Sequence, residues 1–75
     1  MVHYLILVRA KPASQDKFVA AAKKIKGVAD AYPVFGRFDV AVLVEGKTQE
    51  ELRRATREVK AIGGIKSTET MPEAD

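Results

Sequence analysis

The chain has 75 residues, no cysteine and a formal net charge of +3, from 13 Lys and Arg against 10 Asp and Glu. A chain of this length holds one domain and buries only about 60% of the surface that its unfolded form exposes, so a partner subunit is the expected source of further stability. The absence of cysteine excludes disulfides, thiolate catalysis and cysteine-based metal sites. We therefore predict a single domain over residues 1–75 that forms homo-oligomers.

The charge and hydropathy patterns exclude two kinds of partner. Basic and acidic residues alternate along the chain except at Lys23, Lys24 and Lys26, which predicts weak non-specific binding to nucleic acid and a solvated helix face for these lysines. The longest apolar runs, at residues 4–8 and 40–44, are far shorter than the roughly 20 residues of a membrane span. The N-terminus shows no signal peptide. We expect a cytoplasmic protein with no direct nucleic-acid partner and no membrane partner.

The chain is predicted to begin with a strand and an amphipathic helix. Val2 to Arg9 is an apolar run rich in β-branched and aromatic residues, which favours a buried strand. A helix is predicted from Ser14, a candidate N-cap, to Gly27, which supplies a C-terminal stop. Its predicted apolar face consists of Phe18, Val19, Ala22 and Ile25.

A hairpin is predicted in the middle of the chain. Val28 to Phe35 indicates a strand, and because proline cannot donate to a ladder, Pro33 places this strand at a sheet edge or at a bulge. Gly36 and Arg37 mark a turn. The alternation of apolar residues from Phe38 to Glu45 then predicts a second strand of the hairpin.

The last third of the chain is predicted to form a helix and a short strand. Thr48 and Glu51 have the spacing of a capping box, which marks the start of the helix. The glycines at 63–64 end it. Residues 65–71 favour a strand, and the polar tail at 72–75 is predicted to fray.

The element order βαββαβ predicts an α+β, ferredoxin-like fold. Right-handed crossovers around one hairpin give a four-stranded antiparallel sheet in the order 4-1-3-2, with both helices on one face. The two central strands carry apolar residues on both faces, which would leave an exposed patch of roughly several hundred Å² on the open face. We predict dimerisation through this face. The alternative is a thin patch covered by Tyr4, Arg9 and lysine stems.

The inventory of catalytic groups is small. His3 is the one histidine and the chain contains no asparagine, whereas catalysis needs a matched nucleophile, base and charge stabiliser. Dinucleotide-binding and P-loop motifs are absent. Tyr4 and Phe38 on the central strands lack the basic glycine-rich pattern of an RNA-recognition motif. We expect no catalytic residues, no metal site and no cofactor.

Two motifs in the chain are distinctive as a pair. Residues 28–39 read V-x-x-A-Y-x-V-x-G-x-F-D, and after the threonine-capped helix residues 64–70 read G-I-x-x-T-x-T. From Val2 to Met71 the chain resembles the ligand-binding half of the Lrp/AsnC transcriptional regulators, often called the RAM domain. The resemblance implies a non-enzymatic amino-acid sensor that dimerises through its sheet and assembles dimers into a ring.

The resemblance also implies how such a domain would act. Family members join this half to a helix-turn-helix half, but the first predicted strand here begins at Val2. We therefore expect a stand-alone form that does not read operator DNA by itself. It would take part in transcription regulation through co-assembly with a full-length Lrp/AsnC regulator or through buffering of the ligand.

The family's effector site, which lies between dimers, maps onto the hairpin and the last strand. Asp39 can hold the ammonium group of an amino acid, while turn N–H groups, Arg37 or threonine hydroxyls can bind its carboxylate. Each residue also has a simpler explanation: turn geometry for Gly36, a turn cap or a pair with Arg37 for Asp39, and an edge strand for the threonines. The ligand-binding residues implied are Gly36, Arg37, Phe38, Asp39, Thr68 and Thr70.

Three other interpretations stay open. A structural assembly subunit could keep the same fold with a vestigial effector pocket. A small dimeric ferredoxin-like α+β barrel enzyme would need a buried base at the open sheet face, where His3 is the one candidate. The ACT domain, another amino-acid-binding module, shares the βαββαβ order, but the G-x-F-D hairpin and the T-x-T ending favour the Lrp/AsnC family.

Overall fold

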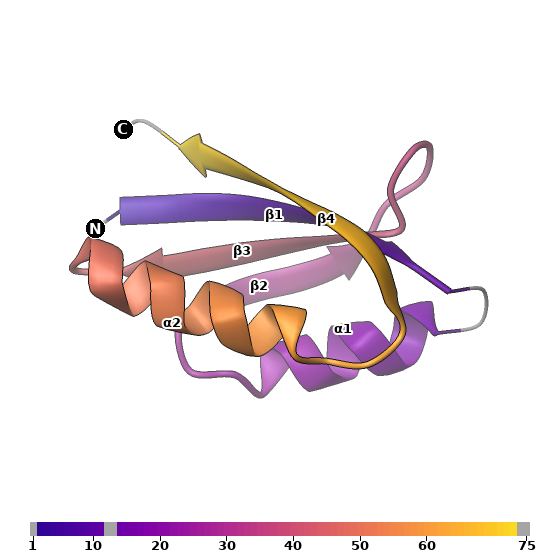
Figure 1. Cartoon of the computed structure of the whole chain (residues 1–75), viewed down its shortest axis with the longest axis horizontal. Helices are drawn as coiled ribbons and strands as arrows, with labels where there is room; N and C mark the ends of the chain where they lie inside the picture. Colours follow the sequence, from indigo (N-terminus) through magenta and orange to yellow (C-terminus); the bar gives the residue numbers. More distant parts are fainter. Residues whose placement is uncertain (1, 12–13, 74–75) are drawn as a thin grey trace.

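A computed structural model describes residues 2–11 and 14–73 and confirms the predicted element order (Figure 1). The four strands form one antiparallel sheet in the order β2-β3-β1-β4, which is the predicted order 4-1-3-2 seen from the other edge. The elements are β1 (Val2–Ala10), α1 (Gln15–Lys23), β2 (Val28–Pro33), β3 (Val40–Gly46), α2 (Gln49–Lys60) and β4 (Ile65–Glu73).

The core lies between the sheet and the two helices, which cover the same face (Figure 1). Helix α1 packs over β2 and β3, and α2 packs over β3 and β1. Alternate residues of the two central strands have no exposed surface, as expected for a strand with one face against a core. The fully buried strand residues are Ile6, Val8, Val40, Val42 and Val44, and the helices bury Phe18, Ala22, Leu52, Ala55 and Val59 against them.

Strand β2 lies at the edge that its proline predicts. It pairs with β3 alone, and Pro33 lies opposite Val40 at the end of the ladder. The register shifts between Val28 and Asp30, so the strand is both an edge and an irregular one. Both features accommodate a residue that cannot donate a ladder hydrogen bond.

The hairpin is more open than predicted. Strand β2 ends at Pro33 rather than Phe35, and β3 begins at Val40 rather than Phe38. Residues 34–39 form a loop that is closed by a hydrogen bond from the Val34 N–H to the Asp39 carbonyl (3.0 Å). The positive φ of Gly36 (+113°) turns the chain inside this loop, so neither flank continues the ladder.

The two helices begin differently. The capping box of α2 is present as predicted: Thr48 Oγ1 accepts from the Glu51 N–H (3.2 Å), and Glu51 Oε2 accepts from the N–H groups of Thr48 (3.3 Å) and Lys47 (2.6 Å). Ser14 occupies the N-cap position of α1, but its side chain makes no cap hydrogen bond. The residue therefore marks where α1 begins without capping it.

Strand β4 is longer than predicted. It extends to Glu73, which lies opposite His3, so the prediction of a frayed tail from residue 72 is wrong for 72 and 73. Strand β1 begins at Val2 and offers a backbone partner along this whole length, which explains the extension. The remainder of the predicted tail, residues 74–75, lies outside the described residues.

Candidate ligand-binding site

Asp39 fastens the hairpin loop to the end of β1. Its Oδ2 accepts a hydrogen bond from the Ala10 N–H (2.9 Å), and its own N–H donates to the Val8 carbonyl (2.8 Å). The Gln15 side-chain amide donates to the Asp39 carbonyl, which ties the start of α1 to the same point. The half-buried carboxylate thus has a structural partner. Within the described part of the chain it forms no ion pair with Arg37.

The other hairpin residues are more exposed. A Cβ on Gly36 would meet nothing within 4 Å, so backbone conformation rather than space favours glycine there. Arg37 is exposed and Phe38 is half-buried. Phe35 is 97% exposed, a feature that sequence reasoning missed because it assigned this residue to the end of a strand.

Thr68 and Thr70 share one face of β4, as their spacing predicts. Thr68 lies opposite Val8 and Thr70 opposite Ile6, so both threonines are on the helix side of the sheet, and both are half-buried. Because Asp39 contacts Val8 from the other flank of β1, the fold brings the hairpin and Thr68 to the same end of the sheet. Thr70 lies two residues further along the strand.

These groups have the chemistry to bind a zwitterion. Only Oδ2 of Asp39 is engaged by a hydrogen bond among the described residues, so the other carboxylate oxygen can accept from an ammonium group. Arg37 and the threonine hydroxyls can donate to a carboxylate. Two pockets in the described part of the chain, one at the end of β3 and one on α2, contain none of these residues.

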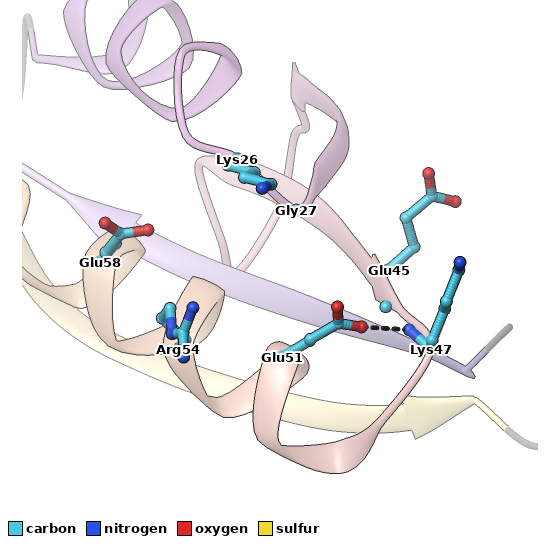
Figure 2. Close-up of a pocket in the computed structure, with 8 residues that line it drawn as sticks. Lys26, Gly27, Glu45, Lys47, Glu51, Arg54 and Glu58 are labelled. Atoms are coloured by element: carbon cyan, nitrogen blue, oxygen red, sulfur yellow. Dashed lines mark hydrogen bonds between the residues drawn. The ribbon is translucent and has the colours of Figure 1, made fainter.

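Acidic and basic side chains come together at the end of the sheet opposite to the hairpin loop, where β3 ends. A pocket of about 330 Å³ opens there between the turn before β2, the end of β3 and one side of α2 (Figure 2). The Glu51 carboxylate in it is held by the Lys47 backbone N–H. A Cβ on Gly46 would lie 2.9 Å from the Glu51 Cβ, so glycine permits this close approach. The lining residues are Lys26, Gly27, Glu45, Gly46, Lys47, Glu51, Arg54 and Glu58.

Sequence reasoning missed this pocket. The capping box that it did identify, Thr48 and Glu51, marks the helix start that forms one wall of the pocket. Lys26 and Gly27 come from the turn before β2, which is remote from that box in the sequence. Only the fold brings them next to α2.

The open face of the sheet is apolar at its centre. Leu5 lies between Leu43 of β3 and Met71 of β4, and Met71 is 43% exposed. In the next row Ala41 lies between Leu7 and Tyr32, which is 44% exposed. These six residues, Leu5, Leu7, Tyr32, Ala41, Leu43 and Met71, form what we call the open-face patch.

Tyr4 does not cover the open-face patch. It packs against the core on the helix side of β1, and its hydroxyl donates to the Gln49 side chain of α2. Tyr4 is therefore not one of the residues that could cover a thin apolar patch on the open face.

His3 lies at one border of the open face. Its Nε2 is 3.3 Å from Oε2 of Glu45, which lies directly opposite on β3. Among the described residues, no group of three His, Cys, Asp or Glu side chains could hold a metal ion. The one histidine is thus part of a surface pair at the patch border.

The model of the Lrp/AsnC ligand binding domain matches residues 4–72. The chain belongs to this family. The family consists of the ligand-binding domains of transcriptional regulators, and the chain shares their βαββαβ sheet. No functionally curated protein matches the sequence significantly. Within the described residues, no helix of this Lrp/AsnC domain has the length and apolar character needed to cross a membrane.

Several solved structures are similar to this Lrp/AsnC domain over its whole length. TTHA0845 from Thermus thermophilus is 28% identical with a TM-score of 0.91, over 100% of this chain and 95% of that one. The hypothetical protein PHS023 from Pyrococcus horikoshii is 27% identical with a TM-score of 0.88, over 99% and 90%. Escherichia coli AsnC shares the fold at 22% identity with a TM-score of 0.84, and the match spans 51% of its chain.

Proposed function

We propose that this Lrp/AsnC domain is a stand-alone amino-acid-binding and oligomerisation module. It dimerises through the open-face patch, binds an amino acid where dimers meet in a ring, and acts in transcription regulation by co-assembly with a full-length Lrp/AsnC regulator. The observation that carries this proposal is the apolar centre of the sheet face opposite the helices. Family membership supports the sensing role.

The open-face patch is suited to a two-fold symmetric contact. The row of Leu43, Leu5 and Met71 crosses three strands and is flanked by the His3–Glu45 pair. A second copy turned by 180° would set the same row against itself, as in an isologous interface. An apolar centre with a polar rim is the usual anatomy of such an interface.

The proposed ligand site consists of Gly36, Arg37, Phe38, Asp39, Thr68 and Thr70. Asp39 would bind the ammonium group of the amino acid, and Arg37 with the threonine hydroxyls would bind its carboxylate. These groups line neither the pocket at the end of β3 nor the hollow on α2, and we propose that a neighbouring subunit is required to enclose the ligand. This requirement supports a site at a contact between dimers.

Light scattering and calorimetry test the two halves of the proposal separately. We expect a mass above that of one chain, and we expect Leu5→Glu to lower it because the variant places a charge at the centre of the patch. The matched control is Ala20→Glu, which adds the same charge at an exposed position of α1, on the opposite side of the sheet from the patch. Equal masses for both variants and the unmodified protein would refute dimerisation through this face.

For the ligand, each common amino acid is titrated in turn by calorimetry. We expect heat of binding with one or a few of them, and a larger assembly or a higher melting temperature in their presence. An oligomer that binds none of the amino acids would instead support the alternative of a structural assembly subunit.

A further inference from the structure

Folding separates charges that alternate along the sequence. The two helices and the turns that flank them, residues 15–26 and 47–60, contain nine Lys and Arg against four Asp and Glu, a net charge of +5. The rest of the sequence contains four basic and six acidic residues, a net charge of −2. All thirteen charged residues of the two helical segments are exposed. The positive excess of the protein therefore lies on the helix layer.

Three arginines of α2 concentrate this charge. Arg53, Arg54 and Arg57 line a hollow of about 440 Å³ on α2 together with Glu50. None of the three forms an ion pair within the part of the chain that the structure describes. Their guanidinium groups are therefore available for the bidentate contacts that arginine makes with phosphate.

Further basic residues lie at the end of α1, across a pocket that is lined by equal numbers of acidic and basic side chains. Arg54 also lines the pocket that contains Lys26, which follows the C-terminal end of α1 (Figure 2). Lys23 and Lys24 are exposed nearby at the end of the same helix. The basic groups thus extend across both helices rather than along one.

The helix layer lacks the apolar anchors that other partners use. The exposed large apolar residues in the described chain are Tyr32, Phe35 and Met71, which belong to β2, the hairpin loop and β4. A membrane-binding helix needs an apolar face, and protein interfaces depend on buried aromatic or aliphatic anchors. Contact with a phosphate backbone needs cations alone. The composition of this surface therefore favours nucleic acid.

We propose that the helix layer, centred on Arg53, Arg54 and Arg57, docks on the phosphate backbone of duplex DNA without reading its sequence. This revises the expectation of no nucleic-acid partner, which rested on the order of charges along the chain and not on their position in the fold. The proposal is independent of amino-acid binding and of dimerisation, because it uses neither the hairpin nor the open-face patch.

The test is fluorescence anisotropy of a labelled DNA duplex of mixed sequence, titrated with the whole protein at several salt concentrations. We expect the logarithm of the binding constant to fall linearly with the logarithm of salt between about 50 and 200 mM. Arg53→Gln/Arg54→Gln/Arg57→Gln should lower the magnitude of this slope by about 2 to 3, since each lost phosphate contact removes about one unit. A second duplex of unrelated sequence should bind equally.

The matched control removes the same charge elsewhere. Arg9→Gln/Lys11→Gln/Lys66→Gln changes three exposed basic residues outside the helix layer and should leave the slope unchanged. Circular dichroism and melting curves establish that both triple variants fold. Absence of binding at about 50 mM salt overturns the proposal. An equal decrease of the slope in the two triple variants also overturns it. Displacement of the duplex by inorganic triphosphate at equal phosphate concentration overturns it as well. The binding of amino acids, measured by calorimetry, does not depend on the outcome of this DNA titration.

Discussion

Replacement of Asp39 separates its structural role from its proposed role in ligand binding. Its carboxylate accepts the Ala10 N–H at 2.9 Å and so ties the hairpin loop to the end of β1. Asp39→Ala removes this acceptor and leaves the N–H of a buried residue without its partner. The sequence alone predicts that Asp39→Ala abolishes ligand binding and leaves folding intact. The hydrogen bond from Ala10 predicts instead that this variant loses both ligand binding and stability.

The size of the stability loss follows from the type of hydrogen bond. Bonds to charged groups contribute about 1.5 to 3 kcal/mol, and an unsatisfied buried donor costs about 1 to 3 kcal/mol. Because Asp39 is half-buried, we expect Asp39→Ala to lower the free energy of unfolding by about 2 kcal/mol. In a domain of this size that corresponds to a fall in Tm of about 8 to 16 °C.

Asp39→Asn is the matched variant. Its amide oxygen can still accept the Ala10 N–H, but it carries no negative charge for an ammonium group. We expect Asn to cost less than about 1 kcal/mol and to abolish amino-acid binding. Urea unfolding at fixed chain concentration measures the first effect, and calorimetry measures the second. An Ala variant as stable as the unmodified protein would refute the structural argument, and an Asn variant with full affinity would refute the ammonium role.

Three further variants test the turns and the helix start by urea unfolding. Thr48→Ala should cost about 1 kcal/mol by removing the cap of α2, whereas Thr48→Ser should stay close to the unmodified protein; equal stabilities would contradict the capping contribution. Gly36→Ala should cost about 1 to 2 kcal/mol from its positive φ alone, since no atom lies within 4 Å, and a neutral effect would show that the loop can change conformation. Gly46→Ala should cost about 2 to 3 kcal/mol because its Cβ would lie 2.9 Å from that of Glu51, and an effect below that of Gly36→Ala would argue against rigid packing here.

The strand order could be predicted because independent features of the sequence agree. Apolar residues on both faces place β1 and β3 in the centre, and Pro33 places β2 at an edge. The capping box at Thr48 fixes the start of α2 from local spacing alone. Each of these signals is contained within one segment, so no knowledge of tertiary contacts is needed to interpret it.

Boundaries that depend on tertiary contacts could not be predicted in the same way. Strand β4 continues to Glu73 because β1 offers a partner at His3, which local composition does not reveal. The contact of the Asp39 carboxylate with the Ala10 N–H joins residues 29 positions apart. The motif at Asp39 therefore indicated an important residue, but the structural part of its role came only from the fold.

The arrangement of surfaces determines how the two proposed interactions relate to each other. The open-face patch and the helix layer lie on opposite sides of one sheet, so both can be occupied at once. In a dimer formed through the patch, the two helix layers would face outward in opposite directions. A short duplex could then contact only one of them, because avidity is lost where geometry forbids simultaneous engagement. Dimerisation would therefore not strengthen binding to a short duplex, and a dimer would instead be able to bridge two duplexes.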